Sequence, residues 1–289
     1  YDGRRFNLTI MNTGQRFSFT QSEHYEDEYD LILQVARDNH IKQPTFLQRK
    51  YQNAFLKGLK NNNLWDKLDE LYVSMGYSDF EFDIMNWKNP NQSLITDPDI
   101  HYKTDGDFNI SLKQGGPTGS LISPLKWNTT DRQISGDKLS FNIFSSNNGN
   151  GENINSNLRH LKTVGGDEIL VRFQNTNMEV NINNSNMGYI AVSAGLSDYP
   201  TVNRIWTRNN DGIIRYYEDG IEYYTTSRPE NNFSNSPDKE IGYLAFVNGT
   251  GGATMYFDII SAGVLVDPSD ILIYNNLFYT MQNAIKKII

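Results

Sequence analysis

Hydrophobic residues recur at two different spacings along the 289-residue chain. Before about residue 80 they recur every three or four positions, which is the period of an amphipathic helix. Beyond that point they alternate with polar residues in short runs separated by Gly, Asn, Asp and Pro, which is the period of β-strands joined by turns. The change of period predicts a small helical segment followed by a mainly β body.

The first part of the chain, residues 1–43, predicts an arm of short strands and one helix. Apolar and polar residues alternate over Phe6–Met11, and Arg16–Thr20 can pair with that run across an Asn-Thr-Gly turn. The stretch Glu26–Asn39 then carries apolar residues at helical spacing.

Residues 44–79 predict a helical hairpin. Pro44 suits the first turn of a helix, and Asn61–Asn63 interrupts that helix before a second apolar stripe over Leu64–Met75. The arm and the hairpin together carry more apolar surface than one sandwich edge covers. We therefore expect the segment before residue 80 to attach the chain to other copies or to another protein, and a chain starting near residue 80 to fold without it.

Residues 80–289 predict one two-sheet antiparallel jelly-roll sandwich, because about ten short β-forming runs follow one another with turn residues between them. The chain closes with a helical stretch over Pro268–Lys287. Asp267 or Ser269 can cap its first turn, and Lys286 complements the dipole at its end. Its apolar stripe would pack on the sandwich or join a symmetric assembly.

Composition narrows the classes of protein. A formal net charge of −8 argues against nucleic-acid binding, which concentrates Lys and Arg. A hydrophobic share of 38% is enough for a packed core. There is no cysteine, so neither disulfides nor thiolate metal ligands are expected. No apolar run approaches the roughly 20 residues of a membrane-spanning helix, so we expect no membrane span.

One short stretch raises the question of catalysis. The residues Asp79–Trp87 read DFEFDIMNW and resemble the E-I-D-I-M-E strand of laminarinase-type glucanases, whose first and last Glu are nucleophile and acid/base. The resemblance puts Glu81 and Asp83 in the first two acidic places and Asn86 in the place of the acid/base. An amide cannot donate a proton to a leaving sugar oxygen, so we expect no glycosidase activity. The stretch also precedes the sandwich, whereas the glucanase strand lies in its middle.

The sharpest hairpin signal is the pair Asp219-Gly220, which suits a two-residue turn with positive φ at both positions. Such a turn places Tyr217 opposite Glu222 and Arg215 opposite Tyr224, with all four side chains on one face. In the run before it, alternation puts Trp206 on a face with two arginines.

These residues form the candidate glycan site, because flat rings beside charged hydrogen-bonding groups suit a sugar. The site consists of Arg215, Tyr217, Glu222, Tyr224 and Trp206. The alternative interpretation is that the tyrosines cover a sheet edge or contact a neighbouring subunit, since aromatic cross-strand pairs are common in ordinary sheets.

Cofactor chemistry has little support in the sequence. No His pair has metal-ligand spacing. Two acidic loops, Asp97-Pro98-Asp99 and Asp105-Gly106-Asp107, offer the oxygen ligands that Ca²⁺ prefers, and the same residues are equally ordinary in turns. No other cofactor is expected.

An ordered set of motifs carries a family resemblance. The set runs LWDKLDELY (Leu64–Tyr72), NWKNP (Asn86–Pro90), YEDGIEY (Tyr217–Tyr223), FDIISAG (Phe257–Gly263) and the final helix. In this order the motifs resemble the concanavalin A-like, or laminin G-like, jelly-roll modules of structural proteins in tailed phages, notably the crAss-like phages of Bacteroides-type hosts. The resemblance covers roughly residues 50–289.

The resemblance implies a virion structural protein rather than an enzyme: a head or tail fibre, a decoration protein or a receptor-binding component, located in the virion. Its implied partners are other virion proteins, further copies of the chain and a host surface glycan. The alternatives that share the fold are a carbohydrate-active, glucanase-like enzyme and a secreted bacterial lectin. The enzyme would need two carboxylates about 5–9 Å apart in a cleft, and no motif supplies them.

Overall fold

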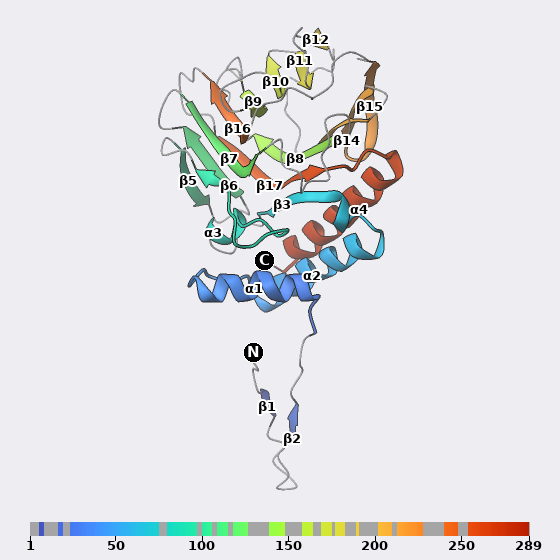
Figure 1. Cartoon of the computed structure of the whole chain (residues 1–289). Helices are drawn as coiled ribbons and strands as arrows, with labels where there is room; N and C mark the ends of the chain where they lie inside the picture. Colours follow the sequence, from blue (N-terminus) through green and yellow to red (C-terminus); the bar gives the residue numbers. More distant parts are fainter. Residues whose placement is uncertain are drawn as a thin grey trace.

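The computed structural model describes residues 6–8, 17–19, 24–74, 80–96, 100–105, 109–114, 118–126, 139–147, 158–163, 169–174, 177–182, 189–190, 202–209, 213–227, 240–247 and 254–288. Two antiparallel sheets form the body (Figure 1), which confirms the mainly β sandwich.

The strands of each sheet follow a spatial order that differs from their order in the sequence. The seven-stranded sheet runs β12 (Tyr189–Ile190), β11 (Asn177–Ile182), β10 (Ile169–Gln174), β9 (Leu158–Thr163), β16 (Glu240–Val247), β7 (Thr118–Lys126) and β4 (Ile95–Thr96). The eight-stranded sheet runs β15 (Ile221–Ser227), β14 (Ile213–Glu218), β13 (Val202–Arg208), β8 (Leu139–Asn147), β17 (Thr254–Gly263), β6 (Asn109–Gln114) and β5 (Ile100–Asp105), with β3 (Leu68–Val73) also paired to β17. Strand β15 therefore lies at an edge of its sheet.

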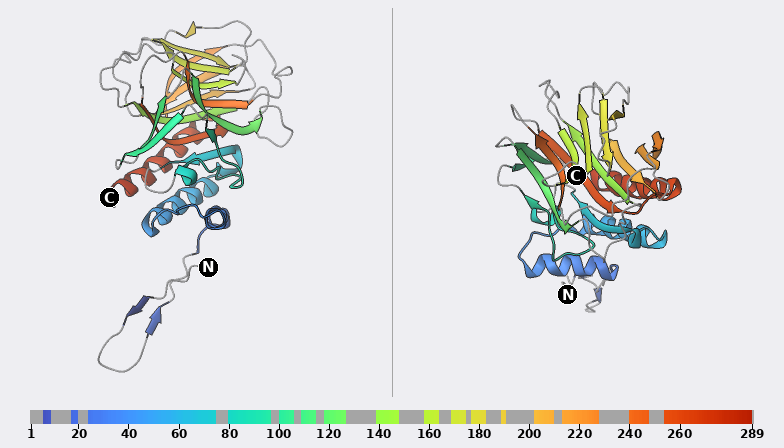
Figure 2. Two further views of the ribbon diagram at one scale, coloured as in Figure 1. Left: turned by 90° about the vertical axis from the view of Figure 1, so that its left-hand side faces the viewer. Right: turned by 45° about the horizontal axis from the view of Figure 1, so that its top comes forward.

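Three longer helices gather on one side of the sandwich (Figures 1 and 2): α1 (Asp27–Asp38), α2 (Phe46–Asn61) and α4 (Pro268–Lys286). Helix α2 begins with a capping box, in which Thr45 and Gln48 each accept a hydrogen bond from the backbone N–H of the other. The helices predicted over Glu26–Asn39 and Pro268–Lys287 are confirmed. Within the described ranges, no helix has the length and apolar character needed to cross a membrane.

The prediction of a second helix in the hairpin, over Leu64–Met75, is wrong for the residues that the structure describes. Leu64 leads into one turn of 3₁₀-helix, η1 (Trp65–Lys67), and the chain then forms strand β3, which pairs antiparallel with β17. Five of the six residues of β3 are buried, since helices cover one face and the sandwich interior the other. A strand buried on both faces shows no alternation, so its apolar residues imitated helical spacing.

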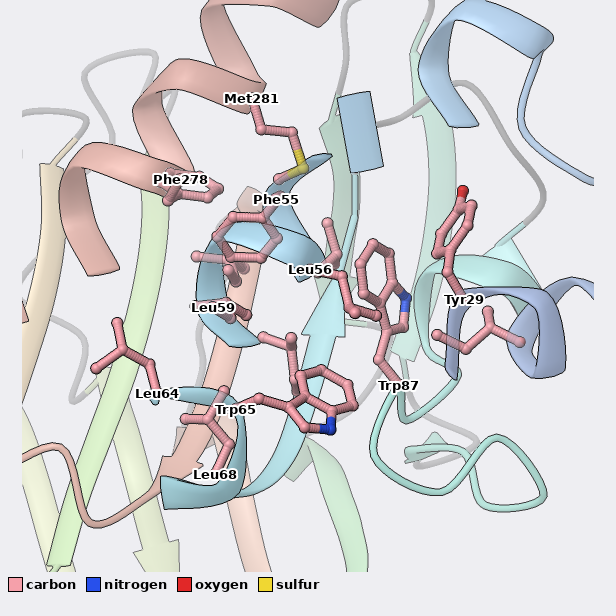
Figure 3. Packing of buried hydrophobic residues seen from close by; sticks show 14 of the residues in the cluster. Tyr29, Phe55, Leu56, Leu59, Leu64, Trp65, Leu68, Trp87, Phe278 and Met281 are labelled. Carbon is pink, nitrogen blue, oxygen red and sulfur yellow. The ribbon is translucent and has the colours of Figure 1, made fainter. Parts of the chain in front are cut away.

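The helices, β3 and the underside of the eight-stranded sheet share one hydrophobic core. Figure 3 shows side chains from α1, α2, η1, β3, α4 and the loop at Trp87 turned toward one another. Phe55 and Tyr274 meet edge to face, with ring centroids 6.1 Å apart. Because this core crosses residue 80 in the sequence, we now expect a chain starting there to lose its fold, contrary to the prediction from the sequence.

A buried carboxylate joins the two sheets inside the sandwich. Glu70 of β3 accepts hydrogen bonds from the hydroxyl groups of Tyr72 at 2.9 Å and Ser123 at 2.6 Å, and from the hydroxyl of Tyr243. Ser123 belongs to β7 and Tyr243 to β16, both in the other sheet. The hydrogen bonds compensate the carboxylate for its loss of water.

The N-terminal arm forms a two-stranded ribbon. Strands β1 (Phe6–Leu8) and β2 (Phe17–Phe19) pair antiparallel, with Phe6 opposite Phe19 and Leu8 opposite Phe17. The ribbon stands away from the body (Figure 2). The predicted pairing of these two runs is confirmed.

Candidate functional site

The glucanase-like stretch does not form a catalytic strand. Residues Phe80–Asp83 make a single helical turn, α3. Glu81 is exposed and Asp83 is buried, so the two carboxylates do not face one shared surface. This geometry gives no pair of carboxylates flanking a sugar.

Asn86, in the place of the missing acid/base, has a structural role. Its buried side-chain oxygen accepts hydrogen bonds from the backbone N–H of Leu71 at 3.2 Å and of Lys88 at 3.0 Å. The N–H of Trp87 donates to the carbonyl of Leu71 at 2.8 Å. The motifs LWDKLDELY and NWKNP are therefore two sides of one hydrogen-bonded unit that fixes β3 beside the helices.

The Asp-Gly hairpin forms as predicted at its tip. Asp219 has φ 52° and Gly220 has φ 82°, and Tyr217 lies opposite Glu222. Beyond that pair the predicted register is wrong: Tyr216 lies opposite Tyr224, and Arg215 lies opposite Thr225 rather than Tyr224. The cause is a β-bulge, in which Tyr223 is the extra residue of β15.

One face of the hairpin is turned toward α4 and the core. Tyr217 is 1% exposed and belongs to the same hydrophobic cluster as Ile205. Its hydroxyl donates to Oε2 of Glu222 at 3.3 Å, and Nε of Arg215 lies 3.7 Å from the same oxygen. Burial raises the pKa of Tyr217 to about 12. Because the Tyr217 ring is buried, it offers no exposed face on which a sugar could stack.

The opposite face carries a series of three aromatic rings. Trp206 is fully buried and stacks on Tyr216, with centroids 5.5 Å apart. The ring of Tyr223 meets Tyr216 edge to face at 6.3 Å and is 51% exposed. Tyr224, which is half-buried, pairs with Tyr216 and so lies on this face as well. The five predicted residues are thus divided between two faces, and the exposed ring is that of Tyr223, which was not among them.

Charged groups border this series of rings. The Tyr216 hydroxyl donates to Oε1 of Glu218 at 2.5 Å, and Arg204 pairs with Glu218 in the sheet register. Arg204 is almost fully buried and also hydrogen-bonds Tyr216, whose pKa burial raises above its ordinary value. Glu218 is half-buried. The exposed Tyr223 ring is therefore held by a second ring whose own position is fixed by two charged side chains.

Helix α4 holds the hairpin turn. Oδ1 of Asp219 accepts hydrogen bonds from the Tyr279 hydroxyl at 2.5 Å and from the backbone N–H of Asn203 at 2.9 Å. The side-chain amide of Asn275 donates to the Asp219 carbonyl at 2.9 Å and accepts from the Asn203 amide at 3.0 Å. A Cβ at Gly220 would meet Leu272 and Asn275, so the turn sits closely against the helix.

The acidic loops that were predicted as Ca²⁺ sites fall almost entirely on residues that the structure does not describe. Asp97-Pro98-Asp99 lies outside the described residues, as does the second loop apart from Asp105. Within the described ranges, no group of three or more His, Asp or Glu side chains could hold a metal ion.

Comparison with known proteins gives a fold and no family. No protein-family model and no curated protein matches the sequence. Solved structures that are similar include the binding domain of botulinum neurotoxin DC in complex with rat synaptotagmin II (TM-score 0.53, 14% identity) and a W1252A mutant of HCR D/C (TM-score 0.55, 14% identity). A third was solved in work on the entry of botulinum neurotoxin type C through two ganglioside molecules (TM-score 0.55, 15% identity).

The matches cover 74–75% of this chain and 52–53% of those chains, so the chain spans about half their length. At this level of identity the likeness establishes a shared β-sandwich fold.

Proposed function

We propose that the chain is a non-catalytic, lectin-like binding module of a virion structural protein, such as a fibre, decoration or receptor-binding component. The observation that carries the binding role is the exposed Tyr223 ring, which Tyr216 contacts edge to face, with ring centroids 6.3 Å apart, on the edge strand β15. An exposed ring that is already fixed loses little conformational entropy when a ligand binds it.

The surroundings of Tyr223 suit a sugar. A pyranose presents an apolar C–H face that packs on an aromatic ring, and its hydroxyl groups need hydrogen-bond partners. Glu218 supplies a carboxylate whose hydrogen bond from Tyr216 uses one oxygen, and Tyr224 supplies a second ring on the same face. This site replaces the one predicted around Tyr217.

The similar structures support the binding role only through their fold. The botulinum neurotoxin binding domains were solved with SialylT, with rat synaptotagmin II and in work on ganglioside entry.

A glucanase-like enzyme is the weaker alternative. The side-chain oxygen of Asn86 accepts two backbone hydrogen bonds. Glu81 is exposed and Asp83 is buried, so the two carboxylates do not line one cleft. A secreted bacterial lectin would share the proposed glycan site and differ in location. The ordered phage-like motifs favour the virion, and an antibody against the chain that labels intact phage particles would support it.

The projecting ribbon of β1 and β2 is the proposed attachment point to other virion proteins or to further copies of the chain. A two-stranded ribbon is marginally stable alone, so a partner that adds contacts would stabilise it. Sedimentation of the full chain, and of a chain lacking residues 1–23, tests this role. A full chain that is monomeric and binds no virion component would contradict it.

The glycan site is tested on an array of host surface glycans with the full chain. We expect binding that Tyr223→Ala weakens about tenfold or more, because the stacking ring is lost. Ile221→Ala is the matched control, since Ile221 lies on the same strand, is 70% exposed and is aliphatic. An array without any bound glycan would reject the binding role. Equal losses in both variants, or none in Tyr223→Ala, would reject the site.

A further inference from the structure

A polar stripe runs along the face of α4 that contacts the sheet. Asn275, Tyr279 and Gln282 follow one another at spacings of four and three residues, which places them on one side of the helix. The first two hold the hairpin turn through Asp219. The third donates a hydrogen bond to a carboxyl oxygen of Asp258 in β17. One helix face thus connects the turn that carries the glycan site to a buried acid.

The position of Asp258 is produced by a second β-bulge. The register between β17 and β8 shifts between Phe257 and Ile259, so Asp258 is the extra residue. Its side chain is buried, and its carbonyl accepts a hydrogen bond from the N–H of Ser74 at 2.8 Å. A bulge turns a side chain out of the regular alternation, and here it turns an acid toward α4.

We propose that α4 is a pH-sensitive clamp on the hairpin, with the carboxyl group of Asp258 as its latch. The part of this inference that concerns ligand rests on the proposed glycan binding. When Asp258 is neutral, Gln282 keeps its contact with Asp258, and Asn275 and Tyr279 keep their hydrogen bonds to Asp219. When Asp258 is ionised, a poorly compensated charge lies under α4, so the helix opens more often and its hold on Asp219 weakens.

The groups around Asp258 favour its neutral form. Burial raises its pKa to about 7, against the opposing effects of the hydrogen bond from Gln282 and the positive charge of Lys286. Among the described residues, Lys286 and Tyr279 are the charged or titratable groups coupled to it, and both belong to α4. The residues paired beside it on β3 and β8 are not titratable.

The sign of the pH effect follows from this direction. In the open state Asp258 ionises near its ordinary value of 3.8, and in the closed state near 7. Between these values the closed state holds the proton and the open state does not, so rising pH favours opening. The loss of closure accumulates from about pH 4 to about pH 7 and is constant above that range.

Hydrogen exchange of the full chain without ligand tests the clamp. After correction for intrinsic rates, we expect protection of α4 and of residues 213–225 to fall on the order of tenfold between pH 5 and pH 8, within the shift of about three pKa units that limits it. Asp258→Asn should remove the fall in both segments. Asp270→Asn, on the same helix, is the matched control and should keep it.

Two outcomes would overturn the clamp. One is the same pH dependence in Asp258→Asn as in the native chain. The other is a fall of protection in α4 with no change in the hairpin, which would leave Asp258 unconnected to the turn. Because hydrogen exchange needs no ligand, it can fail or succeed independently of the glycan array that tests the proposed binding. If a glycan binds, its affinity should fall over the same pH range in the native chain and not in Asp258→Asn.

Discussion

The ammonium group of Lys88 lies 4.2 Å from the centroid of the Trp65 ring and donates a hydrogen bond to the carbonyl oxygen of the same residue at 2.8 Å. Burial lowers the pKa of Lys88, and the nearby carboxylates of Asp66 and Asp69 act against that shift. This contact joins LWDKLDELY and NWKNP, two of the motifs that carry the phage resemblance, so the occurrence of both in one chain has a structural reason.

We predict that Lys88→Met lowers the free energy of unfolding by about 1–2 kcal/mol, because the cation–π contact is lost and the Trp65 carbonyl loses its donor. Lys50→Met is the control, since Lys50 is exposed on α2. Urea denaturation of both variants measures the difference. Equal stability of the two variants would show that the contact contributes nothing.

Asn86→Ala should destabilise the protein by about 2 kcal/mol or more, because the backbone N–H groups of Leu71 and Lys88 lose their acceptor. The exposed neighbour Asn91 provides the control variant Asn91→Ala, which should be nearly neutral. Thermal melts compare the two. In a separate reducing-end assay with β-glucans, Asn86→Glu should release no reducing ends, because Glu81 and Asp83 do not line one cleft with it.

Gly263→Ala should be among the most damaging small substitutions. A Cβ at this position would overlap the backbone carbonyl of Lys67 and approach the Cα of Leu68 to 2.8 Å, so β17 and β3 would have to separate. Overpacking of this kind costs about 1–3 kcal/mol or more.

Gly58→Ala is a matched control for Gly263→Ala, since the nearest atoms to its Cβ would belong to the flexible side chain of Leu277 and Ala favours the helix. Denaturation midpoints should therefore fall for Gly263→Ala and stay close to native for Gly58→Ala. A similar loss in both would contradict the steric argument.

Tyr217→Ala should lower stability by about 3–5 kcal/mol, because it removes a ring that is 1% exposed, whereas Tyr223→Ala should cost little. Chemical denaturation of the two variants separates these expectations. The opposite order would mean that the face of the hairpin toward α4 had been assigned wrongly.

A chain that starts at residue 80 should fail to fold, because it lacks α1, α2 and β3 and exposes the apolar residues of α4 and the sheet that pack against them. A chain that starts at residue 24 should keep the native circular dichroism spectrum, since among the described strands β1 and β2 pair only with each other. Size-exclusion chromatography and circular dichroism test both.

The sequence predicted those elements whose signals are local. The final helix begins at Pro268, in the first turn where proline is tolerated, and the turn at Asp219 and Gly220 has the positive φ values that its residue types favour. Proline placement and turn chemistry act over a few residues, so one sequence suffices to predict them. The predicted cap is wrong in its detail, because Asp267 lies at the N-cap of α4 but its side chain makes no capping hydrogen bond.

Two features depended on distant parts of the chain and were missed. Strand β3 is buried on both faces, and its apolar spacing resembles a helix until β17 is known to lie beside it. The bulge at Tyr223 places Tyr224 on the face opposite to the predicted one. No residue type in Ile221–Ser227 predicts a bulge at this position. The candidate site therefore still lies on the predicted hairpin, but the residues proposed to form it are different.

The pairing of β3 with β17 also sets the order of events when the chain folds. Lys67 and Asp270, which form an ion pair at 2.5 Å, are 203 residues apart in the sequence. Helices α1 and α2 and strand β3 leave the ribosome before strand β17 and helix α4, which pack against them. Contacts of such long range make folding slow, and they leave the apolar faces of α1 and α2 exposed until β17 and α4 have been synthesised. We expect the nascent N-terminal third to depend on chaperones, and to become resistant to protease only after α4 has been made.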